Sequence, residues 1–138
     1  NRRCIDAFVE YARICFTKWK GIVNYWVTIN EQLIAMAASD LNGNHESDKV
    51  LQTKNMYQMS YHASLAEKKA MKLLKEIDPK AKIGVVNAVQ NVYPYSSSPE
   101  DVLAAMDAEE LMMYMLLDMS VKGEYSFRVK NILEKKSK

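Results

Sequence analysis

The sequence predicts an α/β fold built from two parallel strands with helices around them. Two short apolar segments rich in β-branched residues, 22–31 and 82–89, have the profile of strands. Longer segments with apolar residues every three or four positions, the pattern of amphipathic helices, come before, between and after these strands. Strands that alternate with helices along a chain form parallel βαβ units, and this order therefore predicts a parallel sheet.

The composition is that of one globular domain. Of the 138 residues, 49% are hydrophobic and 26% are charged, and the formal net charge is +2. A charge so close to zero gives no reason to expect a nucleic acid as partner. The longest apolar run, 111–117, is much shorter than the ~18 residues that a bilayer-spanning helix needs. We therefore expect neither a nucleic-acid-binding protein nor a membrane protein.

The first predicted helix spans residues 1–19. Asn1 is suited to cap its start, and Gly21 supplies the stop. Cys4 and Cys15 both lie on this helix, where the rise between them is about 16 Å. A disulfide needs Cα atoms within about 7 Å of each other, so these two thiols cannot pair. Sparse, unpaired cysteines fit a reducing, cytoplasmic setting.

The first predicted strand, 22–31, is almost continuously apolar until its last two positions. That profile is typical of a parallel strand buried on both faces. The small apolar residues 32–39 predict a short helix, and the polar stretch 40–48 predicts a surface loop. The remaining predicted elements are a helix at 53–77, the strand at 82–89, a helix from Pro99 to about Met119, and a basic helix at 125–135.

Two strands alone do not make an independent sheet. A parallel pair buried on both faces would leave open edges and uncovered apolar surface. The sequence therefore predicts either a slice of a larger α/β domain or a chain that must associate to bury itself.

The end of the first strand carries the candidate chemistry. Catalytic groups in parallel α/β folds lie at the carboxyl ends of strands, where this chain has Asn30 and Glu31. A carboxylate can protonate a leaving sugar oxygen while an amide holds a hydroxyl, although such a pair is more often a cap on the next helix. Strict alternation would point the two side chains to opposite faces. If both serve one sugar, a bulge or a sharp twist must re-aim one of them.

Several motifs resemble one known family. Segment 8–16 reads F-V-E-Y-A-R-I-C-F and segment 23–31 reads V-N-Y-W-V-T-I-N-E. They resemble the helix and strand of glycoside hydrolase family 1 that carry F-V-x-Y-A-x-x-C-F and Y-W-x-T-x-N-E. The resemblance implies an α/β fold that is an incomplete (β/α)8 TIM barrel, with residues 1–138 as a fragment of one catalytic domain. It continues in order through 61–66, 82–84, 99–102, 107–110 and 123–125.

The family resemblance also implies an activity and roles for two residues. Family members hydrolyse β-glycosides with retention, use two glutamates, and need no metal or organic cofactor. Glu31 would be the general acid/base, and Asn30 would hydrogen-bond the sugar 2-hydroxyl. Gln32 stands where most of the family has proline, which resembles the branch acting on 6-phospho-β-glucosides. The expected partner of the complete enzyme is then a β-glucoside 6-phosphate, and an unphosphorylated β-glucoside is the alternative.

The second glutamate that the family uses is not in this chain. Retaining hydrolysis needs two carboxyl groups about 5 Å apart, and neither motif nor position identifies a partner for Glu31. We therefore expect the isolated chain to be an inactive fragment. The alternative is a non-catalytic partial barrel that self-associates through exposed strand edges.

Overall fold

The computed structural model describes residues 2–38 and 47–136 of the chain. The chain divides into two compact units, Asn1–Val86 and Asn87–Lys138. Across the described residues, no helix combines the length and the apolar character that crossing a membrane requires.

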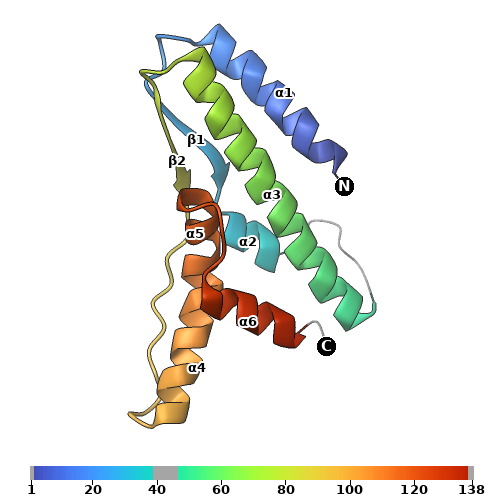
Figure 1. The fold of residues 1–138 in the computed structure, drawn as a ribbon, viewed down its shortest axis with the longest axis vertical. Coiled ribbons are helices and arrows are strands. Elements are labelled where there is room, and N and C mark those ends of the chain that lie inside the picture. Colours follow the sequence, from blue (N-terminus) through green and yellow to red (C-terminus); the bar gives the residue numbers. More distant parts are fainter. Residues whose placement is uncertain (1, 39–46, 137–138) are drawn as a thin grey trace. The chain divides into compact units, whose positions relative to one another are not determined.

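The first unit is a two-stranded parallel sheet with helices packed against it (Figure 1). Helices α1 and α3 lie side by side, and α3 contacts both strands. The order of helices and strands agrees with the sequence prediction. The elements are α1 (Arg3–Lys18), β1 (Tyr25–Asn30), α2 (Gln32–Ala37), α3 (Lys49–Ile77) and β2 (Lys82–Val86).

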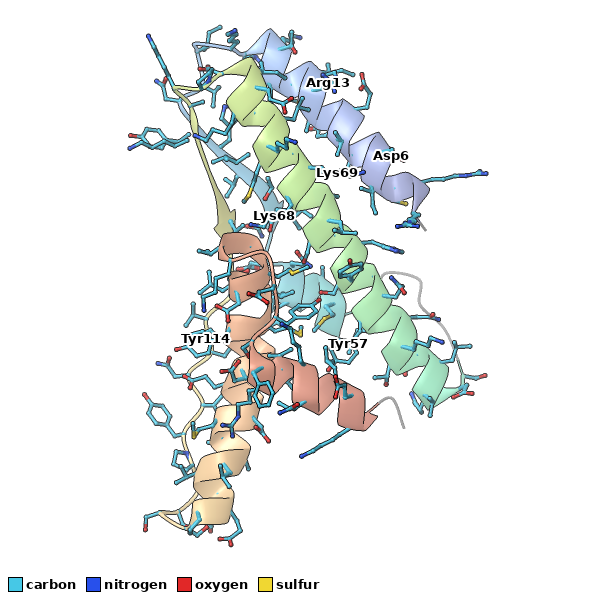
Figure 2. All side chains as sticks on the ribbon, in the orientation of Figure 1. Asp6, Arg13, Tyr57, Lys68, Lys69 and Tyr114 are labelled. Atoms are coloured by element: carbon cyan, nitrogen blue, oxygen red, sulfur yellow. The ribbon has the colours of Figure 1, made fainter. Side chains whose placement is uncertain are left out.

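The core of the first unit lies between α1, α3 and one face of the sheet. Its buried members come from both helices and from the turn before β2, and half-buried strand residues pack against them. The ring of Phe16 on α1 meets that of Trp26 on β1 edge-on, with centroids 4.8 Å apart. At the exposed rim of the helix pair, Lys69 Nζ lies 3.4 Å from Asp6 Oδ1 (Figure 2). The buried core residues are Ala12, Phe16, Ala70, Leu73, Leu74 and Ala81.

The prediction that the first strand is buried on both faces is wrong for this chain. Trp26 and Thr28 point toward the helices and are half-buried, whereas Tyr25 is 75% exposed and Val27 is 57% exposed. A continuously apolar strand is expected where both faces of the complete sheet are covered by other parts of the protein. Within the described residues of the first unit, the helices α1 and α3 pack on one face of the sheet.

The element boundaries differ from prediction where local hydrogen bonds decide them. Strand β1 starts at Tyr25 because the N–H groups of Ile22 and Val23 are still bonded to the Trp19 carbonyl in the turn that follows α1. Gly21 has a φ of 73° in this turn, which favours glycine. Helix α3 starts four residues earlier than predicted, because the Asp48 carboxylate accepts hydrogen bonds from the N–H groups of its first turn.

Four other sequence predictions have different outcomes in the structure. Cys4 and Cys15 are free thiols on α1, as predicted. The proposed cap Asn1 lies outside the described residues, and so does most of the predicted loop, 40–46. Strand β2 ends at Val86, three residues before the predicted end.

The second unit contains the two predicted C-terminal helices. The first of them is continuous but includes one π-helical turn, η1 (Glu110–Tyr114), between α4 (Pro99–Glu109) and α5 (Met115–Val121). The Ser98 hydroxyl caps α4 by accepting the Asp101 N–H at 3.2 Å. Gly123 follows with a φ of 86°, and the last helix is α6 (Phe127–Lys136).

Candidate active site

Strand β1 contains a bulge just before its end. Val27 pairs with Gly84, but Asn30 pairs with Val86, so β1 takes three steps where β2 takes two. Such an irregularity is required if Asn30 and Glu31 are to serve one sugar. Bulges re-aim side chains and are frequent beside active sites.

Glu31 has an unusual backbone conformation directly after this bulge. Its φ of 47° and ψ of 55° are left-handed, and among the described residues it is the one non-glycine residue with positive φ. Its N–H donates to the Val86 carbonyl at 2.9 Å, and its own carbonyl accepts from Ile34 at 2.9 Å and Ala35 at 3.2 Å. A left-handed non-glycine residue costs on the order of 1–3 kcal/mol, and such residues cluster at functional sites.

The Glu31 side chain does not cap the helix that it precedes. Glu31 occupies the N-cap position of α2, yet within the described part of the chain its carboxylate makes no capping hydrogen bond. Helix capping therefore does not explain why a glutamate stands at this position.

Asn30 and Glu31 line the same hollow in the first unit. The hollow has a volume of about 300 Å³ and is open to solvent. Its other lining residues, Ile34, Ala35 and Ala38, come from α2 and its C-terminal end. The two predicted site residues, which are neighbours in sequence, thus both border this hollow, together with small and apolar residues of α2 and its C-terminal end.

The sequence analysis did not identify the α2 wall of this hollow. The small and apolar residues after Glu31 predicted a helix, but no pattern indicated which of its faces borders the site.

Among residues 2–38 and 47–136, no group of three His, Cys, Asp or Glu side chains is placed to hold a metal ion.

The family comparison covers the complete chain. The model of the family described as Glycosyl hydrolase family 1 matches residues 1–138. The chain belongs to glycosyl hydrolase family 1. The family resemblance drawn from the sequence motifs is therefore confirmed.

Similar family 1 proteins with curated names include two phospho-glucosidases. The chain is 36% identical over 129 residues to the 6-phospho-beta-glucosidase AscB of Escherichia coli, covering 91% of this chain and 26% of that protein. It is 34% identical over 134 residues to the 6-phospho-beta-glucosidase GmuD of Bacillus subtilis, covering 97% of this chain and 29% of that protein. The chain therefore spans less than a third of the length of these relatives.

A solved family 1 structure has the same fold. The family 1 b-glucosidase from Thermotoga maritima matches with a TM-score of 0.82 at 23% identity, over 99% of this chain and 30% of that one. At this identity the likeness shows the fold alone. It confirms the predicted fold class, an α/β segment of an incomplete TIM barrel with two parallel strands and flanking helices.

Proposed function

We propose that this segment carries the general acid/base of a retaining β-glycoside hydrolase that acts on 6-phospho-β-glucosides. The observation that supports the proposal most strongly is the shared hollow of Asn30 and Glu31, since the Glu31 carboxylate is not used for capping. Family membership and two relatives named as 6-phospho-beta-glucosidases support the reaction class and the substrate.

The proposed reaction has two steps, and Glu31 acts in both. The protonated Glu31 carboxyl donates its proton to the glycosidic oxygen as the bond between the anomeric carbon and that oxygen breaks. A second carboxylate, outside these 138 residues, attacks the anomeric carbon and forms a glycosyl ester. The Glu31 carboxylate then accepts a proton from the water that displaces this ester, while the Asn30 amide hydrogen-bonds the sugar 2-hydroxyl throughout.

The identity of residue 32, Gln32, and the names of the two relatives favour a 6-phosphorylated substrate. The groups that would bind the phosphate lie outside this segment in the proposal. Because bacteria form 6-phosphorylated glucosides during uptake, we place the complete enzyme in the cytoplasm. Faster hydrolysis of the unphosphorylated β-glucoside than of its 6-phosphate would favour the alternative substrate.

The first experiment is the intact mass of the native gene product. The proposal expects a protein several times larger than the 15.8 kDa of this chain, because the second carboxylate must come from other residues. A native product of 15.8 kDa would rule out the proposed activity.

The second experiment tests Glu31 in this full-length product. Glu31→Gln should lower kcat/KM on a methyl 6-phospho-β-glucoside by roughly 10²–10⁴-fold, the usual contribution of general acid catalysis. On the 4-nitrophenyl 6-phospho-β-glucoside, kcat/KM should fall far less, because it reports the first step only and nitrophenolate leaves without a proton. Glu76→Gln, the same change at an exposed position on α3, should leave both rates unchanged. Equal losses on the two substrates would refute the acid/base role of Glu31.

A second proposal concerns the isolated chain of 138 residues. Tyr25 and Val27 expose apolar surface on the uncovered face of the sheet, and each strand has a single neighbour. Such surfaces favour association, and light scattering should show assemblies that grow with protein concentration. A monodisperse monomer that melts cooperatively would contradict this proposal.

A further inference from the structure

The residue after Glu31 makes an unusual set of buried contacts. Gln32 is the first residue of α2, and it is only 6% exposed. Its side-chain Nε2 donates to the carbonyl of Ser60 at 2.8 Å and to the hydroxyls of Ser60 at 3.1 Å and Ser64 at 3.0 Å. Both serines are buried on α3. The two N–H groups of the Gln32 amide are therefore shared among three acceptors on the opposing helix.

These contacts supply an anchor that α2 needs. The helix has six residues, and helices of this length are not stable in water without tertiary contacts. Among the α2 side chains that the structure describes, those of Leu33 and Met36 are buried as well. Among these three buried residues, Gln32 is the one whose contacts are directional, so it can fix the position of the first turn of α2 on α3.

The anchor lies next to the strained residue. The left-handed backbone of Glu31 is held on its N-terminal side by the bond to Val86 of β2. On its C-terminal side it is held by α2, since the Glu31 carbonyl accepts the N–H groups of Ile34 and Ala35. A conformation that costs free energy persists only when its surroundings fix it from both sides.

We propose that Gln32 is a positioning residue for Glu31. By holding the first turn of α2 on Ser60 and Ser64, it keeps the Glu31 backbone left-handed and its carboxylate in the hollow beside Asn30. This inference rests on the proposed acid/base role of Glu31. A proline at position 32 could not act in this way, because it has no side-chain amide to bond Ser60 and Ser64.

The test uses Gln32→Met in the full-length product. Methionine has nearly the same shape as glutamine but donates no hydrogen bond, and the two serine hydroxyls can turn to carbonyls of their own helix. We expect kcat/KM on the methyl 6-phospho-β-glucoside to fall by roughly tenfold or more, since small misplacements of a catalytic group have effects of this size. On the nitrophenyl substrate, kcat/KM should change by less than about threefold, because this ratio reports the first step only and that step needs no proton for nitrophenolate to leave.

Two further variants keep the inference testable. The double variant Ser60→Ala/Ser64→Ala removes the two hydroxyls but keeps the backbone carbonyl of residue 60 as acceptor. It should give a smaller change in the same direction. If Gln32→Met does not fold, this double variant tests the positioning role in its place. Lys75→Met is the matched control. It removes a comparable hydrogen bond of 2.7 Å from Lys75 Nζ to the Ala81 carbonyl, near the C-terminal end of α3. It should not change the ratio of the two rates.

The outcomes separate this inference from the proposed function. If Glu31→Gln shows the dependence on the leaving group and the Gln32 and serine variants do not, only the positioning role is overturned. Equal losses of both rates in Gln32→Met, or a lower Tm with unchanged rates, would also overturn it. If Glu31→Gln itself lacks the dependence, the proposed function fails first.

Discussion

Thr28 Oγ1 donates a hydrogen bond of 2.7 Å to Glu67 Oε1 and so ties the bulged end of β1 to α3. Glu67 is 2% exposed, and it is among the largest fully buried side chains of the described residues. A buried carboxyl group loses its hydration, so its hydrogen bonds to the protein matter for stability. This bond holds the strand from which Asn30 and Glu31 project.

We predict that Thr28→Val destabilises the full-length protein by about 1–3 kcal/mol, the cost of removing a partner from a buried polar group. Thr28→Ser is the control, because it keeps the hydroxyl and removes only a methyl group. The free energy of unfolding in urea measures both changes. If the valine and serine variants lose the same stability, the hydrogen bond is not the cause.

The sequence predicted the framework of the first unit because that framework depends on periodicity. The apolar residues every three or four positions on α3 and the β-branched residues before Asn30 predicted the type and order of the elements. The type and the order both agree with the structure. Strand alternation required a bulge or a sharp twist if Asn30 and Glu31 serve one sugar, and the register shift between Val27 and Asn30 is such an irregularity. These features depend on local residue patterns, which a single sequence contains.

Other features depend on contacts between distant segments, and the sequence did not predict them. The left-handed backbone of Glu31 is held by Val86, and the engagement of Gln32 requires Ser60 and Ser64 to face it from another helix. Nothing in residues 30–32 indicates these partners. The π-helical turn η1 was missed as well, since apolar spacing does not separate it from an α-helix.

We predict that Asp78 makes the first unit sensitive to acid. Its carboxylate accepts the Gly21 N–H at 3.0 Å and the Lys80 N–H at 3.3 Å, and the bond from Gly21 is the main reason that the Asp78 pKa lies below its usual 3.8. A lowered folded-state pKa stabilises the protein above the unfolded-state value, and this contribution is lost as the pH falls through the folded-state value.

The measurement is Tm between pH 7 and about pH 3 for the parent protein and Asp78→Asn. The asparagine oxygen still accepts a hydrogen bond but carries no charge, so the variant should be less stable at pH 7. It should also lose less Tm than the parent below about pH 4, where aspartates begin to bind protons. Parallel loss of Tm in the two proteins would contradict the role of Asp78.

In the second unit, we predict that Ser126→Ala destabilises the protein by about 1 kcal/mol, the usual cost of losing a helix cap. The Ser126 hydroxyl accepts the Val129 N–H at 3.1 Å at the start of α6 and donates to Glu110 Oε2 at 2.8 Å in the π-helical turn. Ser126→Thr keeps the hydroxyl and should lose less. Urea unfolding compares the variants, and equal losses would show that the hydroxyl is not responsible.

The last prediction separates the role of Asn30 from that of Glu31. If the Asn30 amide holds the sugar 2-hydroxyl, it acts on the sugar and takes no part in proton transfer to the leaving group. Asn30→Ala in the full-length protein should therefore lower kcat/KM on the methyl and the nitrophenyl 6-phospho-β-glucosides by the same factor. That factor should be on the order of a hundredfold, since hydrogen bonds to this hydroxyl supply several kcal/mol in the transition state.

A substrate without the 2-hydroxyl provides the decisive comparison. On a nitrophenyl 2-deoxy-6-phospho-β-glucoside, the parent protein has already lost the contact, so Asn30→Ala should change kcat/KM by less than about threefold. A full loss on the deoxy substrate would mean that Asn30 acts through the bulge of β1 instead. Glu31→Gln should keep its dependence on the leaving group with either sugar, because the proton that it controls goes to the glycosidic oxygen. The Asn30 and Glu31 variants should thus respond differently to the two changes of substrate, because in the proposal the amide contacts the sugar and the carboxyl group contacts the leaving oxygen.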